Sequence, residues 1–147
     1  MTRKILFVTG TRADFGKLEP LAIAARDAGH RVTFFVTGMH MMDRYGLTVN
    51  EVRRMPGTAT HEFLNQRMGD PQDIVLAKTV TGLSDYLAEN RPDLVVIHGA
   101  GAYGFVMGSN YNSRPLAAEV LLSDGQARLI RRRQSFDDLV RDEEIPG

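Results

Sequence analysis

The stretch "FVTGTRADFGK" places Gly10, Arg12 and Lys17 between an apolar run and a segment of helical spacing. In open α/β sheets, ligands bind beyond the carboxyl ends of the strands, and helix N-termini attract anions. Gly10 would let a ligand approach the backbone, and Arg12 and Lys17 would supply positive charge for a phosphate. The spacing differs from the glycine-rich dinucleotide fingerprint, so a tight turn with solvated charges is an equal alternative from the chemistry alone.

The stretch "IHGAGAYG" at residues 97–104 combines features of two different sites. His98 follows the apolar run "LVVI", as the first residue of a catalytic loop would. Tyr103 lies in a loop of small residues that could present it to a cofactor, although an aromatic on a loop is the simpler interpretation. The spacings of the histidines match no zinc motif, so we expect no metal; they are His30, His40, His61 and His98.

These residues need a scaffold, and the apolar pattern predicts a parallel sheet. The continuous runs Lys4 to Val8, Val32 to Val36 and "LVVI" are typical of strands buried on both faces. Residues 14–28 and 72–90 carry apolar side chains three or four positions apart, which indicates helices. Residues 39–55 are expected to be partly helical with a break at Gly46, and residues 56–71 to be loop with one short strand. The β-α-β order requires a parallel sheet, with the first strand inside it and helices on both faces.

The pattern changes after residue 104. Asp124-Gly125 lies between weakly alternating runs and predicts a two-residue β-hairpin, and Ser135 with the acidic residues after it predicts the start of a short helix. The best candidate boundary is residues 99–104, which gives an α/β domain at 1–99 and a tail at 100–147.

The composition excludes several classes of protein. The 147 residues are 43% hydrophobic and 24% charged with a formal net charge of zero, as in a soluble globular protein, so bulk charge favours neither nucleic acid nor membrane as a partner. Without cysteine there are no disulfides, thiolate metal ligands or cysteine nucleophiles. The first residues do not form a signal peptide and no apolar run could span a bilayer, so we expect a cytoplasmic protein.

Three separated motifs resemble the N-terminal half of the UDP-N-acetylglucosamine 2-epimerases. They are "KILFVTGTRADFGKLEPL", "FFVTGMHMMDRYGLTVNEV" and "RPDLVVIHG", and they cover residues 3–99 in order. They are most similar to the hydrolysing members that make N-acetylmannosamine or related sugars for sialic-acid-like pathways. The resemblance implies one Rossmann-like half of a glycosyltransferase B fold, whose nucleotide sugar binds between two domains.

By this resemblance, Arg12 and Lys17 lie at the nucleotide-diphosphate end of the cleft. His40 belongs to the second-strand loop that faces the cleft, and His98 begins the family's His-Gly-Asp-Arg motif. The family reaction removes the C2 proton of the sugar, eliminates UDP and adds water, so it needs acid and base groups.

This chain departs from the family at the motif that carries a catalytic carboxylate. The aspartate position is Ala100 and the arginine position is Gly101. A methyl group cannot transfer a proton, so no complete catalytic set is expected and the isolated chain should be inactive.

From residue 100 the sequence is similar to the C-terminal end of diaminopimelate decarboxylases, which are pyridoxal-phosphate enzymes. "GAYGFVMGSNYNSRPLAAEVLL" and "LIRRRQSFDDLVRDE" carry this resemblance, which implies that Tyr103 corresponds to the tyrosine that contacts cofactor and substrate. Such an enzyme needs a Schiff-base lysine in a barrel. Lys4, Lys17 and Lys78 are the lysines of this chain, and none lies in such a context, so no cofactor is expected.

The two resemblances indicate a chimera that joins an epimerase-like half-domain to a decarboxylase-like tail. Three functions remain open: a UDP-sugar or other phosphate binder derived from the epimerases, a fragment of a decarboxylase, or a non-catalytic interaction module. A lone hairpin is marginal in water, so the tail is expected to make the chain a homo-oligomer.

Overall fold

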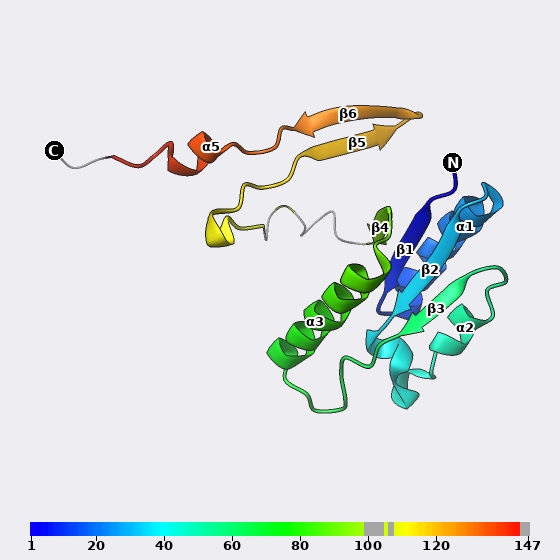
Figure 1. Ribbon diagram of the computed structural model, residues 1–147. Helices are drawn as coiled ribbons and strands as arrows, with labels where there is room; N and C mark the ends of the chain where they lie inside the picture. The colour runs from blue at the N-terminus through cyan, green and yellow to red at the C-terminus, as the bar shows by residue number, and fades with distance from the viewer. Residues whose placement is uncertain (99–104, 106–107, 145–147) are drawn as a thin grey trace. The chain divides into compact units, whose positions relative to one another are not determined.

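The computed structural model describes residues 1–98, 105 and 108–144, and the chain divides into two compact units, Met1–Ala100 and Gly101–Gly147. The first unit is built on a four-stranded sheet with the order β3-β2-β1-β4 (Figure 1). Its strands are β1 (Lys4–Thr9), β2 (Arg31–Val36), β3 (Ala59–Glu62) and β4 (Leu94–Ile97).

All neighbouring strands of this sheet are parallel, with Ile5 of β1 opposite both Val32 of β2 and Leu94 of β4. The parallel sheet with an interior first strand is therefore confirmed. The third strand in chain order, β3, pairs with β2 at one edge and falls in the stretch that carried no clear periodicity.

Helices cover both faces of the sheet, as the sequence predicts. On one face, Phe15 and Leu18 of α1 (Arg12–Asp27) pack into a buried cluster with Phe7 and Phe34, and Val52 of α2 (Val49–Arg53) completes it. Alternate residues of β1 and β2 point to this cluster because successive side chains of a strand face opposite sides.

The opposite face packs against α3 (Gln72–Asn90), which matches the predicted helix. Tyr86 of α3 meets Phe35 of β2 edge-on, with ring centroids 5.7 Å apart. Gly82 lies so close to the ring of Phe63 that a Cβ in its place would overlap the ring. Glycine is therefore needed here for close packing, at some cost in helix propensity.

Two short 3₁₀ segments, η1 (Gly38–Met41) and η2 (Asp43–Tyr45), connect β2 to α2. Gly46 ends η2 in the left-handed conformation, at a φ of 82°. The predicted partly helical stretch with a break at Gly46 is thus confirmed.

The second unit contains η3 (Tyr111–Ser113), the hairpin β5 (Glu119–Ser123) and β6 (Gln126–Arg131), and α5 (Phe136–Val140). Asp124 and Gly125 both have positive φ, as a type I′ turn requires. The predicted hairpin and short terminal helix are confirmed. No helix in the described ranges is long and apolar enough to cross a membrane.

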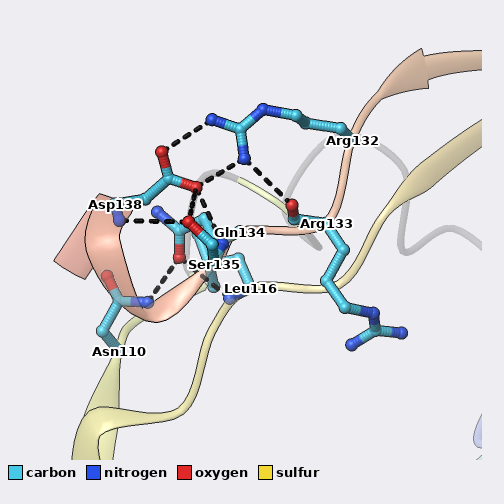
Figure 2. Close-up of polar contacts among 7 residues, drawn as sticks. All are labelled: Asn110, Leu116, Arg132, Arg133, Gln134, Ser135 and Asp138. Atoms are coloured by element: carbon cyan, nitrogen blue, oxygen red, sulfur yellow. Dashed lines mark hydrogen bonds and ion pairs between the residues drawn. The ribbon is translucent and has the colours of Figure 1, made fainter.

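Polar side chains join the end of the hairpin to α5 (Figure 2). The side-chain oxygen of Gln134 accepts bonds from the Leu116 amide at 2.9 Å and from the Asn110 side chain at 2.7 Å. Ser135 and Asp138 form a capping box at the start of α5, and both terminal nitrogens of Arg132 donate to the carboxylate of Asp138.

Asp138 should be the residue on which the start of α5 depends. Its bonds from Arg132, and then from the Ser135 amide, hold the pKa of its carboxyl well below the ordinary value of 3.8. Because the folded pKa is depressed, the stabilisation is present above pH 3.8 and is lost progressively as the pH falls below it. We expect the NMR signal of this carboxyl to remain that of the ionised form through pH 3.8.

The substitution Asp138→Asn tests this role, and Asp137→Asn in the same first turn is its control. The first should raise amide hydrogen exchange at residues 135–138, because the cap loses its carboxylate acceptor, and the second should leave exchange there close to that of the parent chain. Equal exchange in both variants would contradict this role of Asp138.

Candidate functional site

The loops that follow β1 and β2 are bonded to each other at the carboxyl edge of the sheet. The amide of Thr37 donates to the carbonyl of Thr9 at 3.0 Å, and the amide of Met39 donates to the carbonyl of Gly10 at 2.8 Å. Gly38 has a φ of 64°, and a Cβ at this position would lie 2.6 Å from the Gly10 carbonyl oxygen. Only glycine fits this crossing of the two loops. A Cβ on Gly10, in contrast, would meet nothing within 4 Å, so its backbone is open to an approaching ligand.

His40 lies beneath this pair of loops and is fully buried. Its Nε2 is 2.9 Å from the hydroxyl of Thr9, and its Nδ1 is 2.7 Å from the hydroxyl of Thr48. The Thr9 hydroxyl donates to the carbonyl of Thr11, which leaves its lone pairs for a proton on Nε2. This pattern assigns the Nε2–H tautomer, with Nδ1 accepting from Thr48.

The burial of His40 lowers its pKa below the ordinary 6.5, although the nearby carboxylates Asp14 and Glu51 act in the opposite direction. The neutral ring joins the end of β1 to the start of α2. Because its two nitrogens are both engaged inside the protein, His40 can affect a ligand only through the loops that it positions.

Arg12 and Lys17 lie on α1, the helix that begins beside Gly10. The Nε of Arg12 is 2.8 Å from a carboxylate oxygen of Glu51 on α2, and Lys17 is exposed five residues further along α1. Asp14, in the first turn of α1, donates its amide to the capping hydroxyl of Thr11 at 3.2 Å. The carboxylates of Asp14 and Glu51 therefore share this end of the sheet with the two cations. They largely offset the positive charge that the sequence predicts there.

Asn65 is a member of this edge that the sequence analysis missed. It is 4% exposed, its oxygen accepts from the amide of Gly38 at 3.0 Å, and its nitrogen donates to Thr79 of α3 at 2.6 Å. It thereby connects the second loop to the helix on the opposite face. A single asparagine in an aperiodic stretch carries no signal of this role.

His98 follows β4, at the same edge of the sheet. Its Nδ1 is buried and has no hydrogen-bond partner among the described residues. Three residues of the expected loop lie outside the described residues. They are Ala100 and Gly101, at the positions of the family's aspartate and arginine, and Tyr103, which corresponds to the cofactor-contacting tyrosine of the decarboxylases. Within the ranges that are described, no three histidine or carboxylate side chains gather as metal ligands would.

Residues 23–101 match a family model described as UDP-N-acetylglucosamine 2-epimerase. The chain belongs to this family. A UDP-N-acetylglucosamine 2-epimerase of Neisseria meningitidis serogroup B is 47% identical over 98 residues, which are 66% of this chain and 26% of the relative. The resemblance of the N-terminal part to the epimerase family is therefore confirmed.

Diaminopimelate decarboxylases match as well. The enzyme of Escherichia coli K12 is 62% identical over 48 residues, which cover 33% of this chain and 11% of the relative. That of Zymomonas mobilis is 51% identical over 79 residues, which cover 49% of this chain and 18% of the relative. The chain thus spans about a quarter of the length of the epimerase and less than a fifth of these decarboxylases.

Proposed function

We propose that the first unit binds the diphosphate end of a UDP-sugar at the loop that follows β1, and that the isolated 147-residue chain does not turn it over. Membership of the epimerase family is the observation that carries this proposal. Three features of the edge support it: the open backbone of Gly10, the exposed Lys17, and Arg12 at the start of α1. As part of the same proposal, we assign the parent enzyme to the hydrolysing, sialic-acid-pathway type and the protein to the cytoplasm. We also propose that the chain is a chimera of two domains, residues 1–99 and 100–147.

The chemistry of the family explains why binding and turnover separate here. Removal of the C2 proton needs a base, and the family motif places a carboxylate where this chain has Ala100. His98 remains, but its neighbours Gly99 and Gly101 have no side chain that can transfer a proton. The backbone amides and the positive end of α1 do not depend on that motif and can still attract a phosphate.

Binding should be weak, because Glu51 already pairs with Arg12 and would have to release it. One or two charge-assisted contacts of this kind correspond to a Kd of about millimolar order. The double substitution Arg12→Ala and Lys17→Ala should abolish the chemical-shift changes that UDP induces. Lys78→Ala is the matched control, since Lys78 is bound to Asp70 on the surface of α3. UDP-induced changes that persist in the double variant would place the phosphate elsewhere.

The second candidate function, a fragment of a decarboxylase, is favoured by the 62% identity to the Escherichia coli enzyme. The lysines of the first unit do not fit a pyridoxal-phosphate site. Lys4 donates to the carbonyl of Asn90, Lys78 pairs with Asp70, and Lys17 is exposed on α1. Lys4 does line a surface pocket with Arg31 and Tyr86, but its ammonium is bound to the Asn90 carbonyl of that same pocket, so we assign no step to a pyridoxal group.

Thermal unfolding with UDP, UDP-N-acetylglucosamine or pyridoxal phosphate distinguishes the candidates, because a ligand that binds only the folded chain raises its stability. A rise with the two UDP ligands alone is the result that we expect. A rise with pyridoxal phosphate alone would favour the decarboxylase fragment, and no rise with any of them would favour an interaction module.

A further inference from the structure

The β5–β6 hairpin has one apolar face and one polar face. Val120 is opposite Leu129 and Leu122 is opposite Ala127, and the three larger side chains of these pairs are 52%, 64% and 77% exposed. The other face is mostly polar: Glu119 and Arg131 pair at 2.6 Å, and Leu121, which is 48% exposed, lies opposite Arg128. Such alternation is typical of a strand pair that covers a hydrophobic surface.

The two edges of the hairpin differ in charge. Strand β6 contains Arg128 and Arg131 and is followed by Arg132 and Arg133, so a second copy of β6 beside it would bring arginines together. The central residues of β5 are valine and two leucines, with a single charge at Glu119. Charged residues and proline are the usual protection of an edge strand against pairing, and β5 lacks both in its centre.

We propose that β5 pairs with β5 of a second copy of this chain, antiparallel about a two-fold axis at Leu121. In this register Val120 is opposite Leu122 of the other copy, and Glu119 is opposite Ser123. No like charges face each other, and all five residues of the strand take part. The two hairpins then form one four-stranded sheet with the order β6-β5-β5-β6. Such a sheet is more stable than a single two-stranded hairpin, which is only marginally stable in water.

The symmetry of this register gives a direct test, because Leu121 is the residue that faces itself across the axis. Leu121→Lys or Leu121→Glu places two like charges opposite each other, which is destabilising for a cross-strand pair. We expect each variant of the full chain to be monomeric by light scattering while the parent chain is dimeric. An equimolar mixture of the two variants should restore the dimer, now with a lysine opposite a glutamate.

The matched control is Leu129→Lys with Leu129→Glu, at an exposed apolar position of β6. These variants should dimerise singly, and mixing them should change nothing. Circular dichroism checks that each variant is folded. A monomeric parent chain, association without a dimer limit, equal loss of the dimer at Leu121 and Leu129, or no restoration in the mixture would each overturn the proposal.

Discussion

The isolated chain is expected to release no UDP from UDP-N-acetylglucosamine above the rate measured without protein. By the resemblance to the family's His-Gly-Asp-Arg motif, Ala100 stands where a catalytic carboxylate is expected, and loss of a general acid or base alone costs about 10²–10⁴-fold in rate. The chain also covers only 26% of the length of the meningococcal relative. Both effects act on the same reaction, so we expect loss of turnover rather than a reduced rate.

A coupled assay for UDP measures this, with the meningococcal epimerase as the positive control under the same conditions. The variant Ala100→Asp separates the two causes. We expect it to remain inactive, because a carboxylate alone does not provide the rest of the family's cleft. UDP release by the parent chain, or carbon dioxide release from diaminopimelate, would contradict this account.

Replacement of His40 by alanine should be among the most destabilising single changes in the first unit. It would leave a cavity beneath the loops and remove the hydrogen bonds of His40 to the hydroxyls of Thr48 and of Thr9, a residue that is 1% exposed. The expected loss is about 2–4 kcal/mol in the free energy of unfolding, from the cavity and the two lost hydrogen bonds together.

Urea unfolding measures this loss, and His30→Ala is the control. His30 receives one long bond, 3.4 Å from the amide of Arg3, so its replacement should change the free energy by no more than about 0.5 kcal/mol. Similar effects of the two substitutions would show that the contacts of His40 with Thr9 and Thr48 do not hold the loops.

The stability of the first unit should also depend on pH through His40. Because burial lowers the pKa of the folded ring below 6.5, the unfolded chain takes up the proton first as the pH falls. The contribution of the neutral ring is therefore complete above pH 6.5 and declines below it. This part of the pH dependence should disappear in His40→Ala.

The elements that could be predicted from the sequence are those with a local cause. Strand β1 is a continuous apolar run, α3 has helical spacing, and the turn at Asp124-Gly125 needs positive φ at both residues. Ser135 caps α5 because its hydroxyl accepts from an amide three residues on. Each signal lies within a few residues of the structure that it specifies.

The parts of the site that escaped prediction depend on contacts between distant residues. Arg12 pairs with Glu51, 39 positions away (51 − 12), and this pair offsets charge that appears free in the sequence. His40, which the family resemblance placed among residues facing the cleft, is buried because hydroxyls of β1 and of the residue before α2 meet its two nitrogens. No periodicity encodes either arrangement, and both follow only once the strands are paired.

We propose that the loop after β1 keeps a phosphate-binding edge. NMR spectra of the ¹⁵N-labelled full chain, recorded during a titration with UDP, test it most directly. We predict that the largest shift changes fall on the amides of residues 10–17 and 38–40, the two loops joined by the Met39 to Gly10 bond. Shift changes confined to the β5–β6 hairpin, or none up to millimolar UDP, would contradict it.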